Sequence, residues 1–130
     1  MTDLFPDRRP PWRVRLKNLL LDFTGSDWCG YCMALDKEVF STAKFKAWAK
    51  ENVILVQVDF PQGKRQTQKE KRQNEELKKK FGASGYPTVI VASPDGQELA
   101  RKVGYSPKSG PDAYLESLNG RLTKAASAAQ

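Results

Sequence analysis

The chain has 130 residues, enough for one domain but not for two with separate cores. It contains two cysteines and no histidine, which excludes Ser-His-Asp triads, Cys-His nucleophile pairs, histidine-ligated metals and zinc sites with four Cys or His ligands. No metal site and no cofactor are therefore expected. Lys and Arg number 22 against 15 Asp and Glu, which gives a net charge of +7.

The excess positive charge lies in two segments. Residues 63–80 carry eight Lys and Arg against three Asp and Glu, and residues 1–18 carry five against two. We interpret 63–80 as a solvated basic helix; the alternatives are a surface for an acidic partner, for anionic lipid or for nucleic acid. No aromatic residue is interleaved with these charges, so nucleic acid is not expected as a partner.

The sequence contains no strongly apolar segment of membrane-spanning length. No window approaches the ~20 apolar residues that cross a bilayer, so no transmembrane segment is expected. Residues 1–12 lack the apolar region of a secretory signal peptide, so no signal peptide is visible.

The first half of the chain is expected to contain a strand and two helices after an irregular start. Three prolines disfavour regular structure in residues 1–11, and residues 12–18 fit a strand and a helix alike. The apolar run 19–23 predicts a buried strand, in which the acid Asp22 is unusual. The helices are expected over 29–40, capped by Ser26 or Asp27 and packed through Met33, Leu35, Val39 and Phe40, and over 42–51, capped by Ser41.

The second half alternates strands and helices, which predicts an α/β fold with one mixed sheet and helices on both faces. Residues 53–59 are apolar and β-branched and indicate a second buried strand, followed by a loop over 60–66. The helix expected over 67–81 has only Leu77 and Phe81 as large apolar anchors. The remaining elements are a strand over 88–92, its hairpin partner over 97–103, a helix over 111–122 and a flexible tail, 123–130.

The two cysteines form a Cys-X-X-Cys motif between a predicted strand and a predicted helix. A thiol in the first helical turn lies near unpaired backbone N–H groups and the positive end of the helix dipole, which stabilise a thiolate. We therefore expect Cys29 to be the exposed nucleophile of low pKa and Cys32 to be the more buried resolving thiol. The alternatives are two unremarkable cysteines or half of a metal site shared in a dimer.

Four motifs resemble the thioredoxin family in kind and in order. They are Leu20-Leu21-Asp22-Phe23, Trp28-Cys29-Gly30-Tyr31-Cys32, Val58-Asp59 and Phe81-Gly82-Ala83-Ser84-Gly85-Tyr86-Pro87-Thr88. The resemblance covers 19–122 and implies a thioredoxin fold, with a central mixed sheet of four to five strands. The chain departs from the family in an atypical N-terminal segment, 1–18, and in a basic insertion of about 60–73. The stretch 23–29 is similar to thioredoxin-like domains exported to the bacterial cell envelope.

The resemblance also implies roles for individual residues. Asp22 is the buried carboxylate that accepts a proton from Cys32; the alternative is a hydrogen-bonded structural Asp. Lysines often accompany this acid on the next strand, where the present chain has Leu55 and Gln57. Pro87 is a cis-proline that exposes the Tyr86 backbone to an extended substrate. The expected substrate-contacting residues are Trp28, Gly30, Tyr31, Tyr86, Pro87 and Gly104.

These features predict a thiol–disulfide oxidoreductase that acts through Cys29 and Cys32, with a reductase-like direction of exchange. The alternatives are a disulfide isomerase or oxidase, and a non-enzymatic binding module that docks through 63–80. The expected partners are protein disulfides and an upstream redox protein, and the expected state is a monomer. The resemblance favours the periplasm or cell envelope over the cytoplasm.

Overall fold

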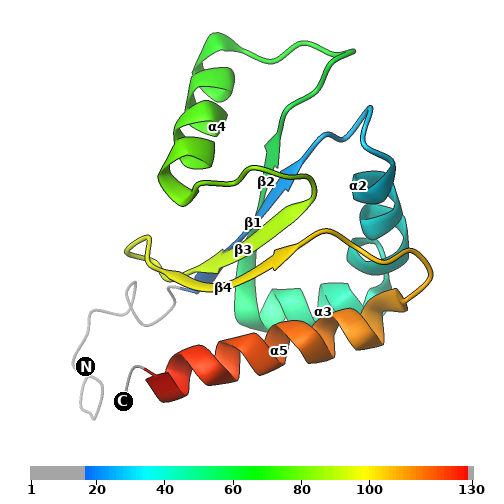
Figure 1. The fold of residues 1–130 in the computed structure, drawn as a ribbon, viewed down its shortest axis with the longest axis vertical. Coiled ribbons are helices and arrows are strands. Elements are labelled where there is room, and N and C mark those ends of the chain that lie inside the picture. The colour runs from blue at the N-terminus through cyan, green and yellow to red at the C-terminus, as the bar shows by residue number, and fades with distance from the viewer. Residues whose placement is uncertain (1–16, 129–130) are drawn as a thin grey trace.

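A computed structural model describes residues 17–128, so most of the predicted segment 1–18 and the end of the tail lie outside the described residues. Within residues 17–128, nine elements follow one another (Figure 1). They are β1 (Asn18–Thr24), α2 (Gly30–Leu35), the π-helical turn η1 (Asp36–Phe40), α3 (Ala43–Asn52), β2 (Val53–Asp59), α4 (Gln68–Phe81), β3 (Thr88–Ala92), β4 (Glu98–Val103) and α5 (Gly110–Ala128).

The four strands form one mixed sheet in the order β2-β1-β3-β4, which confirms the predicted α/β architecture. β1 runs parallel to β2 and antiparallel to β3, and β3 and β4 form an antiparallel hairpin. Asp22 lies in the interior strand β1, opposite Gln57 of β2 and Val89 of β3. The acid singled out in the sequence is therefore flanked by backbone on both sides.

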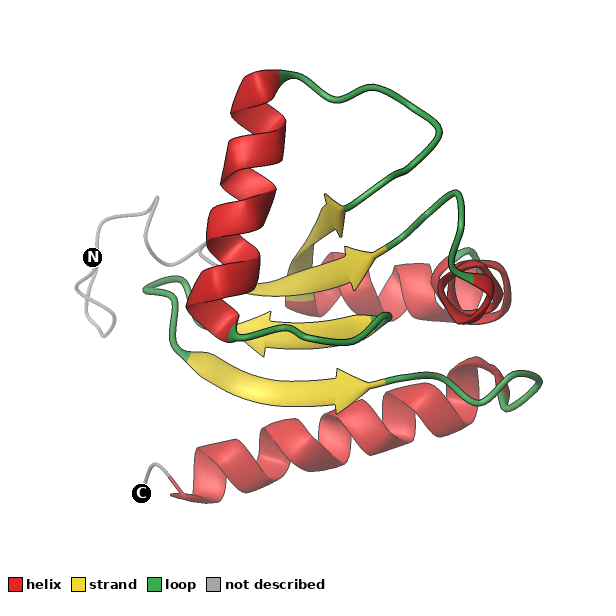
Figure 2. Cartoon of the chain, turned by 45° about the horizontal axis from the view of Figure 1, so that its top comes forward, coloured by secondary structure: helices red, strands yellow, loops and turns green. Residues whose placement is uncertain are grey.

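Helices cover both faces of the sheet (Figure 2). Alternate residues of β1 point to opposite faces, so the strand contributes to a core on each side. On one side Leu20 packs in a core to which α2, η1, α3 and α5 contribute Leu35, Val39, Phe45 and Leu118. On the other side α4 covers a smaller core of five buried residues, Leu21, Phe23, Val58, Ala83 and Ile90, packed by Leu77 and Phe81. The predicted anchoring of α4 by these two side chains is confirmed.

Several local details differ from the sequence-based expectations. The helix expected over 29–40 is an α-helix only to Leu35 and a π-helical turn from Asp36. Its N-cap is Cys29 rather than Ser26 or Asp27, since those two polar side chains bind a distant loop instead. Met33 is 45% exposed and does not join the core.

The later helices also begin or end differently from what was expected. The N-cap of α3 is Thr42 rather than Ser41, and its hydroxyl accepts the Phe45 N–H at 3.2 Å. α5 continues to Ala128, beyond the expected end at residue 122. The added stretch contains several alanines and no Gly or Pro, a composition that favours helix over an irregular tail.

Helix α4 is joined to the sheet by a polar contact as well as by its apolar anchors. Its ends are set by Thr67, whose hydroxyl accepts the Glu70 N–H, and by Gly82, which adopts φ of +63°. Asn74 is buried in the middle of the helix, and its Nδ2 donates to the Asp59 carbonyl at 2.9 Å. This bond ties the helix to the last residue of β2.

Asn74→Ala is expected to lower the free energy of unfolding by about 1–2 kcal/mol, because it removes a buried hydrogen bond. Urea denaturation followed by circular dichroism measures the change. Gln73→Ala, at the adjacent exposed position, is the matched control and should change stability by less than about 0.5 kcal/mol. Equal losses in the two variants would contradict this role of Asn74.

Candidate active site

The two cysteines lie where β1 has ended and α2 begins, and they form a disulfide. Their Cα atoms are 5.2 Å apart, within the usual range for this bond. Cys29 is the N-cap of α2, and its sulfur accepts the Cys32 backbone N–H at 3.2 Å. The helix start thus directs a backbone donor at the sulfur of the predicted nucleophile.

Both sulfur-bearing side chains are buried in this oxidised form. Cys29 is 7% exposed and Cys32 is 4% exposed, so the expectation of an exposed Cys29 is wrong for this state. The bond to Cys32 holds the Cys29 side chain against the first turn of α2. The residues between them do face solvent: Tyr31 is 59% exposed, and a Cβ added at Gly30 would meet no atom within 4 Å.

Trp28 connects the cysteine loop to two other parts of the site. Its indole Nε1 donates to the Phe60 carbonyl at 2.7 Å, and its ring meets the Tyr86 ring edge-on at 5.5 Å. The indole also lies against Gly25, where an added Cβ would stand 2.3 Å from the ring. The contact with Tyr86 brings the residue before Cys29 beside the residue before Pro87.

The Tyr86–Pro87 peptide bond is cis, as the resemblance implied. The Pro87 carbonyl accepts the backbone N–H of Gly104 at 2.7 Å, which places Gly104 beside the proline. Gly104 has φ of +83°, a conformation that favours glycine. The structure therefore brings Trp28, Tyr86, Pro87 and Gly104 to the same end of the sheet as the cysteines.

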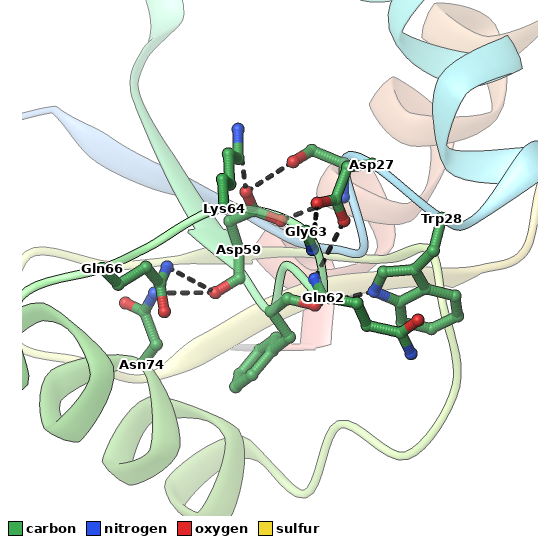
Figure 3. Close-up of polar contacts among 10 residues, drawn as sticks. Asp27, Trp28, Asp59, Gln62, Gly63, Lys64, Gln66 and Asn74 are labelled. Atoms are coloured by element: carbon green, nitrogen blue, oxygen red, sulfur yellow. Dashed lines mark hydrogen bonds and ion pairs between the residues drawn. The ribbon is translucent and has the colours of Figure 1, made fainter.

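A polar network, which the sequence did not indicate, fixes the loop before Cys29 (Figure 3). The buried carboxylate of Asp59, at the end of β2, accepts the Ser26 backbone N–H at 2.9 Å and the Ser26 hydroxyl at 2.5 Å. Lys64 Nζ lies 3.5 Å from the same carboxylate. The Asp59 backbone carbonyl accepts the side-chain amides of Gln66 and Asn74.

Asp27 forms the second half of this network. Its carboxylate accepts the backbone N–H groups of Gln62 at 3.0 Å and Gly63 at 2.7 Å, and these bonds lower its pKa. The loop that follows β2 is thus hydrogen-bonded along its length to the loop that precedes Cys29. The partners are separated by 33 to 36 residues, so no local pattern in the sequence reports them.

Asp22 lines a cavity of about 190 Å³ on the face of the sheet covered by α2 and η1. Asp36, Leu55 and Gln57 also line it. Oδ1 of Asp22 is buried and has no hydrogen-bond partner among residues 17–128. Burial, and to a lesser extent the charges of Asp36 and Asp59, raises the pKa of Asp22 to about 7.

Asp22 and the helix that carries Cys32 border the same cavity. The Asp36 backbone N–H donates to the Cys32 carbonyl, so Asp36 lies one turn beyond Cys32 on a wall of the same cavity. Tyr114 of α5 packs in the core on this face, and its hydroxyl is buried without a partner in the described part of the chain. Burial and the charge of Asp22 raise the pKa of Tyr114.

Two negative findings apply to the described residues alone. Between residues 17 and 128, no group of three or more Cys, Asp and Glu side chains is placed to hold a metal ion. None of the helices in that range is both long enough and apolar enough to cross a membrane.

Comparisons with known proteins agree with this geometry. Residues 14–119 match the family model of thioredoxin-like domains. Among curated proteins, a disulfide bond reductase, DsbH of Chlamydia pneumoniae, is 34% identical over 106 residues, which cover 82% of this chain and 63% of the relative. The thioredoxin-related protein DsbJ of the same organism is 32% identical over 71% of this chain and 26% of its own length. The chain thus spans less than two thirds of either relative.

Solved structures show the same fold. A DsbH oxidoreductase superposes with a TM-score of 0.79 and 31% identity, covering 85% of this chain and 76% of the other. A thioredoxin from Thermus thermophilus superposes with a TM-score of 0.59 at 20% identity, covering 88% of this chain and 80% of the other, and supports the fold alone.

Gly25→Ala is expected to destabilise the protein by about 1–3 kcal/mol, because the added methyl group overlaps the Trp28 ring. The displacement should also shift the NMR signal of the Trp28 indole N–H, which now donates to Phe60. Gly120→Ala in α5 is the matched control: its added Cβ meets no atom within 4 Å and should stabilise by ~0.5–1 kcal/mol. An unshifted indole signal in Gly25→Ala would contradict the close packing.

Asp22→Asn is expected to stabilise the oxidised protein at alkaline pH. Because the folded pKa lies above the unfolded value, the folded state holds an extra proton between the two values, and stability falls as pH rises through that window. The free energy of unfolding of the variant should exceed that of wild type by on the order of 2–4 kcal/mol at about pH 8 and by little at about pH 4, as measured by urea denaturation. Asp95→Asn is the control, because the pKa of that exposed carboxyl is lowered by the Ser93 hydroxyl, and it should give no such gain.

Proposed function

Because the chain belongs to the family of thioredoxin-like domains, we propose that it reduces disulfide bonds in protein substrates through Cys29 and Cys32. The observation that carries the proposal is the disulfide at the start of α2 together with Asp22, on the face that this helix covers, whose buried Oδ1 has no hydrogen-bond partner within residues 17–128. The chain is homologous to thiol–disulfide oxidoreductases of the Dsb family, one of which is named a disulfide bond reductase. That name supports the reductive direction over oxidation or isomerisation.

In the first step the Cys29 thiolate attacks one sulfur of the substrate disulfide. A bond forms between Cys29 and that sulfur, the substrate S–S bond breaks, and the second substrate sulfur leaves as a thiolate that takes a proton from water. The Cys32 N–H that points at the Cys29 sulfur, together with the positive end of the helix dipole, stabilises the attacking thiolate. The helix start thus lowers the cost of ionising Cys29.

In the second step Cys32 loses its proton to Asp22, directly or through water in the adjoining cavity, and attacks the Cys29 sulfur. The Cys29–Cys32 disulfide forms, the mixed disulfide breaks, and the substrate sulfur that was bonded to Cys29 leaves as a thiolate that takes a proton from water. Two electrons have then passed from the protein to the substrate. An upstream dithiol protein must return them before another cycle. Asp36, Leu55 and Gln57 are exposed, so the cavity also connects Asp22 to solvent for release of the proton.

The substrate polypeptide lies across the surface formed by Trp28, Gly30, Tyr31, Tyr86 and Gly104, beside Pro87, whose own side chain is buried. The cis bond turns the Tyr86 backbone to one side, where an extended peptide can pair with it as an added strand. Val103, next to Gly104, is 66% exposed and extends the apolar edge of this surface. The pairing would hold a substrate sulfur in line with Cys29.

Cys32→Ser is expected to trap a covalent complex with a protein disulfide substrate such as insulin, because the first step proceeds and the second cannot. Non-reducing electrophoresis and mass spectrometry of the trapped species measure it. Cys29→Ser is the matched control and should trap nothing.

Asp22→Asn should slow the second step roughly 100-fold, and should slow it more than the first step, as measured by stopped-flow traces. Turnover that survives Cys29→Ser would refute the proposed function.

A further inference from the structure

Four side chains, each from a different segment, meet beside the cysteine loop and form what we call the lysine–aromatic surface: Trp28, Phe60, Lys78 and Tyr86. The Tyr86 ring lies 5.5 Å from that of Trp28 and 5.7 Å from that of Phe60. Lys78 Nζ lies 5.3 Å from the centroids of both the Phe60 ring and the Tyr86 ring. The helix α4 therefore reaches the active site through one ammonium group.

Lys78 differs from the other basic residues of 63–80 in its surroundings. It is half-buried, whereas Lys64, Arg65, Lys69, Lys71, Arg72, Lys79 and Lys80 are exposed. The faces of the Phe60 and Tyr86 rings hold its ammonium group in place, and the Tyr86 side chain raises the pKa of Lys78. Within residues 17–128 no carboxylate forms an ion pair with it. Glu75, one turn earlier on α4, also raises the pKa of Lys78, but it forms no ion pair with Lys78 in the described part of the chain.

The loop that carries Phe60 is also fixed, so the surface exists before a partner arrives. The Phe60 backbone N–H donates to Thr24 and its carbonyl accepts the Trp28 indole, while the following residues bind Asp27 (Figure 3). Trp28 directly precedes Cys29, and Tyr86 directly precedes the cis-proline. A polypeptide that pairs with Tyr86 and presents a sulfur to Cys29 must therefore pass next to Lys78.

We propose that Lys78 selects disulfide substrates that carry an Asp or Glu side chain close to the reactive cysteine. The inference rests on the proposed function and adds the class of substrate to it. A carboxylate can replace water on the ammonium, while the apolar part of the substrate covers Trp28, which is 38% exposed. Nucleic acid and anionic lipid fit this surface less well. Each presents many negative charges, whereas the lysine–aromatic surface offers one ammonium group, half-buried among aromatic rings.

The test uses three peptides with the same internal disulfide, flanked by Glu, by Gln or by Lys. The pre-reduced full chain should reduce the Glu peptide about fivefold faster than the Lys peptide at low salt, and the ratio should approach one at high salt. Lys78→Glu should abolish or reverse the preference, and Lys78→Gln should reduce it. Lys69→Glu, the same charge change on the opposite side of α4, should leave the ratio as in wild type.

The outcomes separate the inference from the proposed function. A chain that reduces all three peptides at equal rates keeps its proposed function and overturns the selection by Lys78, as does a preference that persists in both Lys78 variants. Failure to reduce even the Gln peptide refutes the function and the inference together. Binding of RNA or of anionic vesicles that is lost in Lys78→Gln, with no preference among the peptides, would assign this surface to another partner.

Discussion

The carboxylate of Asp59 is the contact on which the geometry of the site depends. β1 and β2 run parallel, so their carboxyl ends meet at one edge of the sheet, and Asp59 lies at that edge. It is buried and accepts two hydrogen bonds from Ser26, which fixes the turn leading to Trp28 and Cys29. Its backbone carbonyl accepts a hydrogen bond from the side-chain amide of Asn74, which fixes α4 to the same point. The cysteine loop, the second strand and the basic helix are thus held by one residue.

The same alternation that builds the core also places the buried acid. Leu20 and Asp22 point to one side of β1, toward α2, η1 and α5, so a carboxyl at this position must lie beneath the helix that carries Cys32. Among the described residues, a buried Asp22 oxygen without a hydrogen-bond partner costs stability there, and the Tyr114 hydroxyl is a second such group on the same face. A protein selected for stability alone would place apolar side chains at both positions, which is consistent with a role for Asp22 in proton transfer.

The sequence predicts the positions of the strands and the hairpin well, because apolar runs mark β1 and β3, which lie inside the sheet and are mostly buried. The expectation that 53–59 is a buried strand is wrong in part: β2 is the last strand on one side of the described sheet, and Ile54 and Leu55 are about half exposed. It also indicates the cysteine pair, Asp22 and Pro87 through motifs of known order. It does not indicate the cap at Cys29, the buried Asn74 or the contacts of Asp27 and Asp59. The hydrogen bonds that join Asn74 and Ser26 to Asp59, and Gln62 to Asp27, link residues 15 to 35 positions apart. Asn74 also lies in a helix whose other residues are mostly charged, so its burial leaves no local pattern. The cap at Cys29 is a local contact with Cys32, but cysteine is not one of the usual N-cap residues.

In the basic segment 63–80, the number of charged residues does not reveal which lysine lies at the active site. Most of its Lys and Arg side chains are exposed, as a solvated helix requires. Helix periodicity nevertheless places Lys78 next to Asn74, Leu77 and Phe81, at the border of the face that packs on the sheet. Ordering a lysine side chain normally costs conformational entropy when a partner binds. The Phe60 and Tyr86 rings hold Lys78 in place beforehand, so a substrate carboxylate meets a charge that is already ordered. Among residues 17–128, α4 thus supplies the cation that contacts the Phe60 and Tyr86 rings.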